Sequence, residues 1–301
     1  MNWKDKLTQI VKKPPLWDEP LSRYTSIGIG GPAEALVFPQ SRVELQNVLA
    51  LAKEFDLPFF ILGSGTNLLV RDGGIKGLVI SLLPISTHCT FNHRSLSAGA
   101  AISLPLLTRM AVGYNLQGLE FAAGIPGSLG GALYMNAGAF GSCIGEFVRE
   151  AEIMDYEGNI QTLSRQELEF SYRRSSFQNS RVIILSAVLE LSPANGVDLK
   201  TLLQKNRLER CSRQPSLPSA GSVFRNPPGL AAGRLLDDLG VKGKSVGGAM
   251  VSREHANFIV NAGAATASDV LSLIDRLREN VYKEYKIDLE LEIVVVGENR
   301  D

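Results

Sequence analysis

The stretch LGSGTNLLVRDGG at residues 62–74 decides the fold. The apolar run 59–62 before it predicts a strand, and its glycines predict a loop directly after that strand. Such a loop offers backbone N–H groups to an anion such as a diphosphate. It lacks the GxGxxG spacing of a Rossmann turn and the GK[ST] ending of a Walker loop, and no clear helix follows it. The loop alone is equally consistent with a structural turn.

Two further uncharged loops share this character, TSIGIGGPA at 25–33 and AGIPGSLGG at 123–131. The chain has 29 glycines in 301 residues, against about 21 expected at ~7% usage. Glycine is favoured where φ is positive or where the backbone approaches another group closely. The clustering favours a large bound ligand over ordinary turns. Loops of this kind suit a long ligand with a diphosphate in its middle, such as a dinucleotide.

Length and composition exclude several classes of protein. A chain of 301 residues suggests about two domains, and 45% hydrophobic with 21% charged residues is typical of globular proteins. The 31 basic and 31 acidic residues cancel, so we expect no nucleic-acid partner. Residues 1–13 lack the apolar core of a signal peptide. The uncharged run 121–145 is too rich in glycine for a spanning helix, so we expect no membrane association.

Cysteine and histidine are sparse. Cys89, Cys143 and Cys211 are an odd number without metal-like spacing, so we expect no disulfide framework and a cytoplasmic location. The three histidines include no pair at metal-ligand spacing beside acidic residues, so we expect no metal site. His255 is expected to be structural.

The pattern predicts a chain in two parts. The capping boxes at Ser41 and Thr266 each open a helix, and the polar break 192–196 separates a strand-dominated part from a smaller α+β part. Strand 289–296 alternates, with Leu289, Leu291, Ile293 and Val295 on one face and Glu290 and Glu292 on the other. The remaining elements expected are strands at 59–62, 77–83 and 181–191 and a helix at 199–212.

The segments that carry a family resemblance are YTSIGIGGPAE (24–34), LGSGTNLLVRDGG (62–74), EFAAGIPGSLGGALYMNAGAFG (120–141), YRRSSF (172–177), AGSVFRNP (220–227), GGAMVSREHANFIVN (247–261) and LELEI (289–293). With these segments together, the chain resembles the UDP-N-acetylenolpyruvoylglucosamine reductase family. The resemblance implies an α+β protein with a two-subdomain FAD-binding domain of the p-cresol methylhydroxylase / vanillyl-alcohol-oxidase type at 1–196. A smaller α+β substrate-binding domain follows at 197–301. The short interval from Arg173 to Ser222 resembles the family's shorter type II form, which lacks a substrate-covering loop.

The resemblance also implies a reaction. FAD, bound non-covalently, is reduced by NADPH, and UDP-N-acetylglucosamine enolpyruvate is then reduced to UDP-N-acetylmuramate, a peptidoglycan precursor. Hydride passes from flavin N5 to C3, and Ser222 protonates C2. The protein is expected to be a monomer. The residues implied to contact FAD are Gly28, Gly30, Gly31, Gly63, Ser64, Gly65, Thr66, Asn67, Gly124, Pro126, Gly127, Gly131, Ala132 and Asn136.

Three residues are implied to be catalytic, namely Ser222, Arg173 and Glu292. A guanidinium stays protonated, so Arg173 would stabilise developing charge and not transfer a proton. Asn226 and Arg213 are implied to contact substrate, Arg213 at its diphosphate. Without the resemblance, the residues themselves would indicate a turn or capping role for Ser222, surface positions for Arg173 and Arg213, and a solvated side chain for Glu292. Only the motif distinguishes Glu292 from Glu290, because both are expected on one face.

Other functions stay open at this point. One is an oxidase of the same fold that uses O₂. Another is a UDP-sugar-binding module without catalysis, which leaves the glycine loops unexplained. A Rossmann dehydrogenase fits poorly, because the strand–loop–helix fingerprint is missing.

Overall fold

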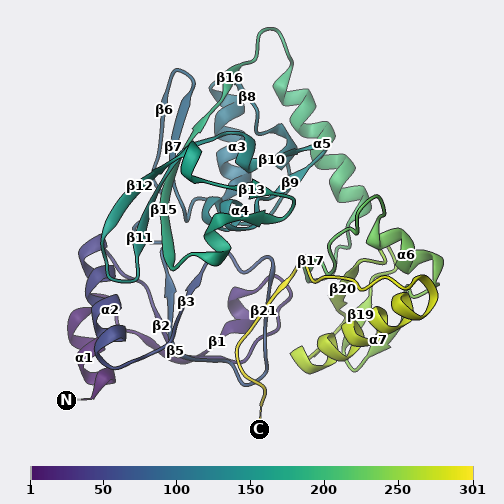
Figure 1. Ribbon diagram of the computed structural model, residues 1–301, viewed down its shortest axis with the longest axis horizontal. Coiled ribbons are helices and arrows are strands. Elements are labelled where there is room, and N and C mark those ends of the chain that lie inside the picture. Colours follow the sequence, from purple (N-terminus) through teal and green to yellow (C-terminus); the bar gives the residue numbers. More distant parts are fainter. Residues whose placement is uncertain (1, 301) are drawn as a thin grey trace. The chain divides into compact units, whose positions relative to one another are not determined.

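The computed structural model describes residues 2–300 and divides the chain into two compact units (Figure 1). The first unit comprises Met1–Leu16, Ala35–Ser64 and Leu78–Arg210. The second comprises Trp17–Glu34, Gly65–Gly77 and Cys211–Asp301. The sequence predicts a sequential division at residues 196 and 197, whereas these units are assembled from discontinuous segments.

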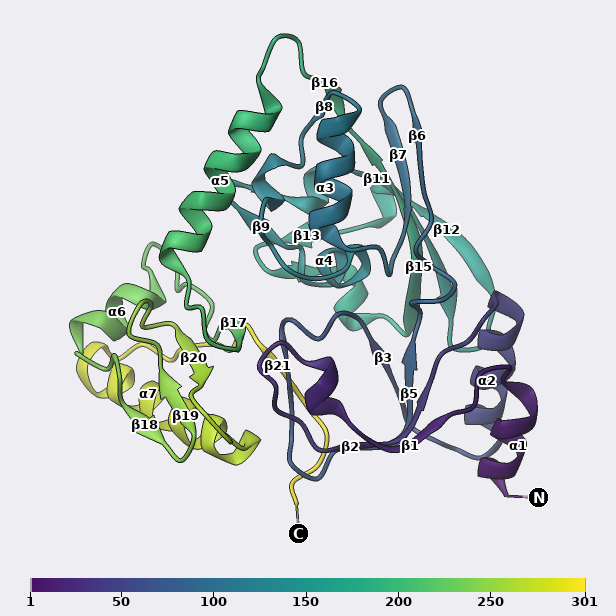
Figure 2. The same cartoon turned by 180° about the vertical axis from the view of Figure 1, so that it is seen from behind.

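The first unit contains the N-terminal helices and most of the strands. A five-stranded antiparallel sheet, in the order β12-β11-β15-β7-β6, is its main layer, and α1 packs against α2 (Figure 2). Its helices are α1 (Trp3–Ile10), α2 (Arg42–Glu54), α3 (Leu104–Gly113), α4 (Leu129–Met135) and most of α5 (Leu199–Arg213). Its strands are β3 (Phe59–Leu62), β6 (Cys89–Asn92), β7 (Ser95–Gly99), β8 (Leu116–Gln117), β9 (Gly138–Ala139), β10 (Ser142–Cys143), β11 (Val148–Asp155), β12 (Ile160–Ser164), β13 (Phe170–Ser171), β14 (Arg174–Ser175), β15 (Val182–Glu190) and β16 (Ser192–Pro193).

Strand β15 contributes to two hydrophobic cores. Its pairing with β11 skips Leu185, so the strand carries a bulge there, and an extra residue reverses which face the following side chains occupy. Ile183 and Leu185 therefore pack with α1 and α2, while Ala187 and Leu189 pack with α3 and α4. One strand thus joins both cores of the first unit.

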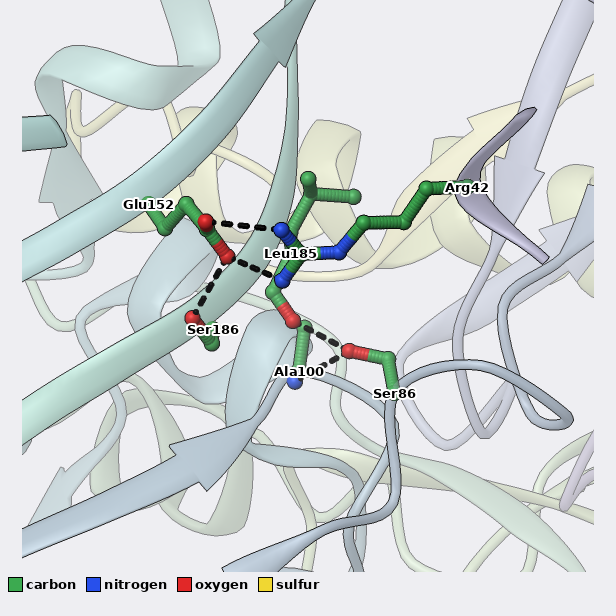
Figure 3. Close-up of polar contacts among 6 residues, drawn as sticks. All are labelled: Arg42, Ser86, Ala100, Glu152, Leu185 and Ser186. Carbon is green, nitrogen blue, oxygen red and sulfur yellow. Dashed lines mark hydrogen bonds and ion pairs between the residues drawn. The ribbon is translucent and has the colours of Figure 1, made fainter. Parts of the chain in front are cut away.

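A polar network secures this bulge (Figure 3). The Ser86 hydroxyl donates to the Leu185 carbonyl and accepts from the Ala100 amide at 2.9 Å. From the start of α2, Arg42 donates to both carboxylate oxygens of Glu152 on β11. Glu152 Oε2 also accepts from the Ser186 hydroxyl of β15 at 3.1 Å. The Ser86 hydroxyl and the Ala100 amide thus satisfy the Leu185 carbonyl, which has no partner in the ladder to β11.

The second unit is a four-stranded antiparallel sheet, in the order β17-β20-β19-β18, together with two helices. The parallel pairing of β21 with β4 places the segment 65–77 in this unit. Its elements are β4 (Leu68–Val70), β17 (Ser219–Ser222), α6 (Ala232–Asp238), β18 (Ser245–Val246), β19 (Ala249–Val251), β20 (Phe258–Asn261), α7 (Ala267–Tyr285) and β21 (Val294–Val296). A further sheet, β1 (Leu16–Pro20), β2 (Pro32–Val37), β5 (Ile75–Ser81) and β3, includes strands that cross the boundaries between the units.

The N-terminus of helix α7 is capped by side chains from two parts of the chain, Thr266 directly before it and Asp72 far away in the sequence. Asp72 accepts from the amides of Ala267 and Ser268 at 2.8 and 2.9 Å, and from the Ser268 hydroxyl at 2.6 Å. Burial alone would raise the pKa of Asp72, but these hydrogen bonds outweigh it and hold the pKa below its usual value. Hydrogen bonds from the Thr266 and Gly248 amides likewise lower the pKa of Asp269.

The local predictions are largely confirmed. The predicted helices correspond to α2, α5 and α7, with Ser41 and Thr266 as N-caps, and the strands to β3, β5 and β15. The strand predicted at 289–296 is wrong over its first half: β21 covers Val294–Val296, and Leu291 makes an isolated bridge to Phe224. Of the helices within residues 2–300, none has the length and apolar content that crossing a membrane requires.

Candidate functional site

Two glycines of the predicted cofactor loops are required by internal packing. A Cβ on Gly31 would lie 2.4 Å from the Asp72 carbonyl oxygen, and one on Gly65 would lie 1.9 Å from the Tyr24 carbonyl oxygen. Gly65 also has a φ of +63°, a conformation that L-residues with a side chain adopt at a cost. These glycines let the loops 24–31 and 65–74 of the second unit pack against each other, whatever they bind.

Gly63 and Gly131 are different, because both face the Ser128 hydroxyl. A Cβ on Gly63 would lie 3.2 Å from Ser128 Oγ, and one on Gly131 would lie 3.4 Å from it. Apart from chain neighbours and the backbone of α4 itself, no other atom of the described chain lies within 4 Å of either Cβ position. Both glycines are exposed. They leave an open backbone surface in the first unit that side chains would fill.

The start of α4 is largely committed to internal hydrogen bonds. The Leu129 and Gly130 amides donate to the carbonyls of Ile102 and Ala100, at 3.0 and 2.7 Å. The Gly131 amide donates to Ser128 Oγ at 3.3 Å. A diphosphate held in this unit would therefore rely on the loop at 63–64 more than on the helix N-terminus.

The donor groups of these loops fit FAD. Residues 62–67 and 123–131 contain no carboxylate that would repel a diphosphate, and they offer backbone amides with the hydroxyls of Ser64 and Thr66. The open surface at Gly63 and Gly131 gives a ligand direct access to main-chain groups. Backbone amides in such turns are effective anion donors.

Arg173 lies at the tip of a tight hairpin in the first unit. β13 pairs with β14, which leaves Tyr172 and Arg173 as the turn. Arg173 has a φ of +55°, which is strained for a residue with a side chain, and such strain concentrates at functional sites. Its Nη1 donates to the Gly138 carbonyl at 3.0 Å, and its guanidinium carbon lies 5.3 Å from the Tyr172 ring centroid. The guanidinium is thus directed by two local contacts.

Asn136 anchors that hairpin. It ends α4 in the left-handed conformation, and its side chain is 3% exposed. Its Nδ2 donates to the Ser171 carbonyl at 2.8 Å, and its Oδ1 accepts from the Gly145 amide at 3.0 Å. The side-chain amide therefore supports the Arg173 turn, and its implied contact with FAD stays a prediction.

Ser222 ends β17 at an irregularity of the second unit's sheet. The pairing of β17 with β20 shifts between Ser219 and Ser222, and Gly221 has a φ of +84°. A bulge of this kind redirects the side chain that follows it. Ser222 is half-buried, and the chain then leaves the sheet.

Glu292 lies beside this segment and differs from Glu290. The Glu292 amide donates to the Val223 carbonyl, and the Arg225 amide donates to the Glu290 carbonyl, both at 2.8 Å. The Glu290 side chain is 65% exposed and lies 3.5 Å from Arg225 Nη1, whereas Glu292 is half-buried. The structure thus brings Ser222 and Glu292 to adjoining backbone positions, and burial distinguishes the two glutamates that the sequence pattern alone does not.

The two predicted substrate residues are both exposed. Asn226 Oδ1 accepts from the Ala232 amide at 3.0 Å, at the start of α6. Arg213 is the last residue of α5. It belongs to the second unit with Ser222, Glu292 and Asn226, while Arg173 belongs to the first.

Several side chains bind main-chain groups around Ser222 and Glu292, a role that the sequence did not predict. Among them, Asn67 was predicted as an FAD contact, and the others were not predicted as site residues. Asn67 Nδ2 donates to the Glu292 carbonyl at 2.9 Å, and Ser26 Oγ donates to the Ser219 carbonyl at 2.6 Å. Asn261 Nδ2 donates to the Ile27 carbonyl at 3.2 Å. Asn257 binds both polar groups of the Phe224 main chain. The sequence signal for Asn257 was its place directly before the apolar run FIV, in HANFIV at 255–260, because a buried amide requires partners.

Comparison with known proteins first defines a class. The family profile described as "FAD binding domain" matches residues 33–164. The fold also resembles that of a 4-ethylphenol oxidase from Gulosibacter chungangensis, with a TM-score of 0.50 at 16% identity over 64% of this chain and 42% of that one. These matches define the class as proteins with the FAD-binding fold that the sequence predicts.

The family follows from closer matches. The profile described as "UDP-N-acetylenolpyruvoylglucosamine reductase, C-terminal domain" matches residues 214–296. Proteins with that reductase name are 44% identical in Caldanaerobacter subterraneus, over 98% of both chains, and 47% identical in Moorella thermoacetica, over 94% of this chain and 93% of the relative. The crystal structure of the reductase (MurB) from Thermus caldophilus matches with a TM-score of 0.79 at 37% identity, over 92% of this chain and 97% of that one. The chain belongs to the UDP-N-acetylenolpyruvoylglucosamine reductase family.

Proposed function

We propose that this protein uses FAD and NADPH to reduce UDP-N-acetylglucosamine enolpyruvate to UDP-N-acetylmuramate, a step of peptidoglycan precursor synthesis. Family membership over nearly the whole chain supports this reaction. FAD, when bound, supplies the redox chemistry, accepting electrons from NADPH and delivering hydride to C3 of the enolpyruvyl group. The protein's own residues position the reactants and manage charge and the proton.

Ser222 is the proposed proton donor to C2. A serine hydroxyl is a weak acid in water, but the carbanion-like centre left by hydride addition is a strong base. A hydroxyl already held beside it needs no diffusional encounter. The bulge at Gly221 and the half-buried position of Ser222 support a fixed direction for this hydroxyl.

Arg173 and Glu292 are proposed to stabilise the charge that moves toward the substrate carboxylate. Arg173 keeps its positive charge and offers planar donors for a carboxylate. Glu292 would contribute in its protonated form, which can donate a hydrogen bond to that carboxylate. The observation that carries this proposal is the 2.8 Å hydrogen bond from the Glu292 amide to the Val223 carbonyl. It brings Glu292 next to Ser222 from a distant part of the sequence.

Substrate and cofactor contacts complete the proposal. Arg213 is proposed to bind the substrate's diphosphate, and Asn226 the substrate near Ser222. We also propose a monomeric protein located in the cytoplasm, with its substrate-binding part within 197–301. FAD is proposed to contact Gly28, Gly30, Gly31, Gly63, Ser64, Gly65, Thr66, Asn67, Gly124, Pro126, Gly127, Gly131, Ala132 and Asn136.

The decisive experiment follows NADPH oxidation by the purified, air-equilibrated protein, with and without UDP-N-acetylglucosamine enolpyruvate. We expect oxidation that depends on the enolpyruvyl substrate, and a product two hydrogens heavier by mass spectrometry. Fast oxidation without that substrate would indicate an oxidase. A colourless protein with no oxidation would favour a UDP-sugar-binding module.

A further inference from the structure

Asn257 makes an unusual double contact with one residue far away in the sequence. Its Nδ2 donates to the Phe224 carbonyl at 2.8 Å, and its Oδ1 accepts from the Phe224 amide at 2.9 Å. Its own carbonyl accepts from the Val223 amide at 2.8 Å. Asn257 is 4% exposed and Phe224 is 1% exposed. A single buried side chain therefore satisfies the polar main-chain groups of a segment that has left the regular sheet.

That segment carries the residues of the proposed second half-reaction. Ser222 lies two positions before Phe224, and Asn226 lies two positions after it. The carbonyl of Val223, between Ser222 and Phe224, accepts the Glu292 amide. On the other side of Ser222, Gly221 has a positive φ. The direction of the Ser222 hydroxyl and the place of Glu292 thus depend on how residues 223–225 are held.

The Asn257 side chain is itself held in place. Its main chain is fixed nearby, because the backbone amide of Asn257 donates to His255 Nδ1 at 3.1 Å. Burial, and then the charge of Lys242, lower the pKa of His255, which favours the neutral ring that can accept this bond. Ser252, which is fully buried, orders the same turn by accepting from the amides of Glu254 and His255 at 3.1 and 3.3 Å.

We propose that Asn257 is a positioning residue for proton transfer, fixing the Ser222–Arg225 segment so that the serine hydroxyl and Glu292 keep their places during the reduction of the enolpyruvyl substrate. This inference rests on the proposed function. It assigns Asn257 no contact with substrate or FAD.

The test compares Asn257→Leu, which keeps the branched shape without the polar atoms, with Ser252→Ala. Ser252→Ala removes buried hydrogen bonds from the same turn and leaves the contacts to Phe224 in place. Stopped-flow absorbance measures flavin reduction by NADPH, then anaerobic reoxidation by UDP-N-acetylglucosamine enolpyruvate. Misplacement of a reacting group by ~1 Å costs about 100-fold, so we expect reoxidation in Asn257→Leu to slow by about that factor. We expect flavin reduction to change by less than about threefold, and Ser252→Ala to keep the wild-type ratio of the two rates.

Hydrogen exchange supplies a readout that needs no substrate. Peptides covering 222–226 should exchange faster in Asn257→Leu than in the wild type, and at the wild-type rate in Ser252→Ala. If Asn257→Leu does not fold, both measurements are made on Asn257→Asp, which keeps an acceptor oxygen for the Phe224 amide and loses the Nδ2 donor. Unchanged exchange at 222–226, or equal loss of both half-reactions in Asn257→Leu and Ser252→Ala, would overturn the positioning role. A wild-type protein that does not reduce the enolpyruvyl substrate would instead overturn the proposed function.

Discussion

Substituting alanine for Gly65 and for Gly63 separates the two reasons for glycine in the loop 62–67. In Gly65→Ala, the left-handed φ costs about 1–2 kcal/mol. The new methyl group also lies 1.9 Å from the Tyr24 carbonyl oxygen, and overpacking of this kind typically costs about 1–3 kcal/mol. We expect the free energy of unfolding of the FAD-free protein to fall by about 2–5 kcal/mol. At about 2 °C per kcal/mol for a chain of this size, its melting temperature should fall by roughly 4–10 °C.

Gly63→Ala is the matched variant. Its Cβ would lie 3.2 Å from Ser128 Oγ, a contact that a small shift relieves, and an ordinary φ lets alanine reduce the entropy of the unfolded chain. We expect the FAD-free stability to stay within about 1 kcal/mol of wild type. The methyl group would cover backbone that FAD is proposed to contact, so the dissociation constant for FAD should rise at least tenfold, or by about 1.4 kcal/mol.

Thermal melts of the FAD-free proteins and titration with FAD measure both quantities. The reasoning is refuted if Gly65→Ala has the same melting temperature as the wild type, because the close approach to Tyr24 would then have no effect on stability. It is also refuted for the cofactor surface if Gly63→Ala binds FAD as tightly as wild type does.

Three further predictions concern single side chains. Ser222→Ala should slow substrate-dependent flavin reoxidation by about 10²-fold or more while NADPH still reduces the flavin; equal loss of both steps in stopped-flow traces would make Ser222 structural. Glu292→Gln should slow the same step, whereas Glu290→Gln, at the 65% exposed position, should turn over like wild type; the reverse order would mean that the motif was misassigned. Hydrogen bonds hold the pKa values of Asp72 and Asp269 below their usual values, so their stabilisation is present above the unfolded-state pKa of about 3.9 and is lost as the pH falls through the lower folded-state pKa. Asp72→Asn should therefore be less stable than wild type in urea at pH 7, with a difference that shrinks below about pH 4; a constant difference would contradict the linkage.

The sequence predicted the features that short stretches of chain determine. The capping residues Ser41 and Thr266 open the helices where expected, because a cap and its helix lie within a few residues of each other. The division into units was not predicted in the same form. The segment 65–77 joins the C-terminal unit through pairing of β4 with β21, and no local pattern reports such a distant partner.

The candidate site shows the same distinction. The motifs identified Ser222 and Glu292, but alternation alone placed Glu290 and Glu292 as equals. Their difference in burial arises because the chain at 290–292 lies beside 223–225 and not within a regular strand. The glycine pattern was attributed to a ligand as a whole. Gly65 shows that part of it serves internal packing, since its Cβ would meet the Tyr24 carbonyl.

The backbone that carries Ser222 and Glu292 is secured largely by side-chain amides and a hydroxyl. Asn67 binds the Glu292 carbonyl, Asn257 binds Phe224, and Ser26 binds the Ser219 carbonyl. Segments that leave a sheet lose the ladder that would satisfy their polar groups, so side chains must supply the partners. Ser222 and Glu292 can therefore lie on backbone that does not follow the geometry of a regular strand. The side-chain contacts still hold that backbone in a fixed place. Because each contact comes from a single side chain, replacing one should displace a reacting group while the hydrophobic core around Phe224 remains packed. The rates of the two half-reactions, and not the free energy of unfolding alone, are therefore needed to test the roles of Asn67, Asn257 and Ser26.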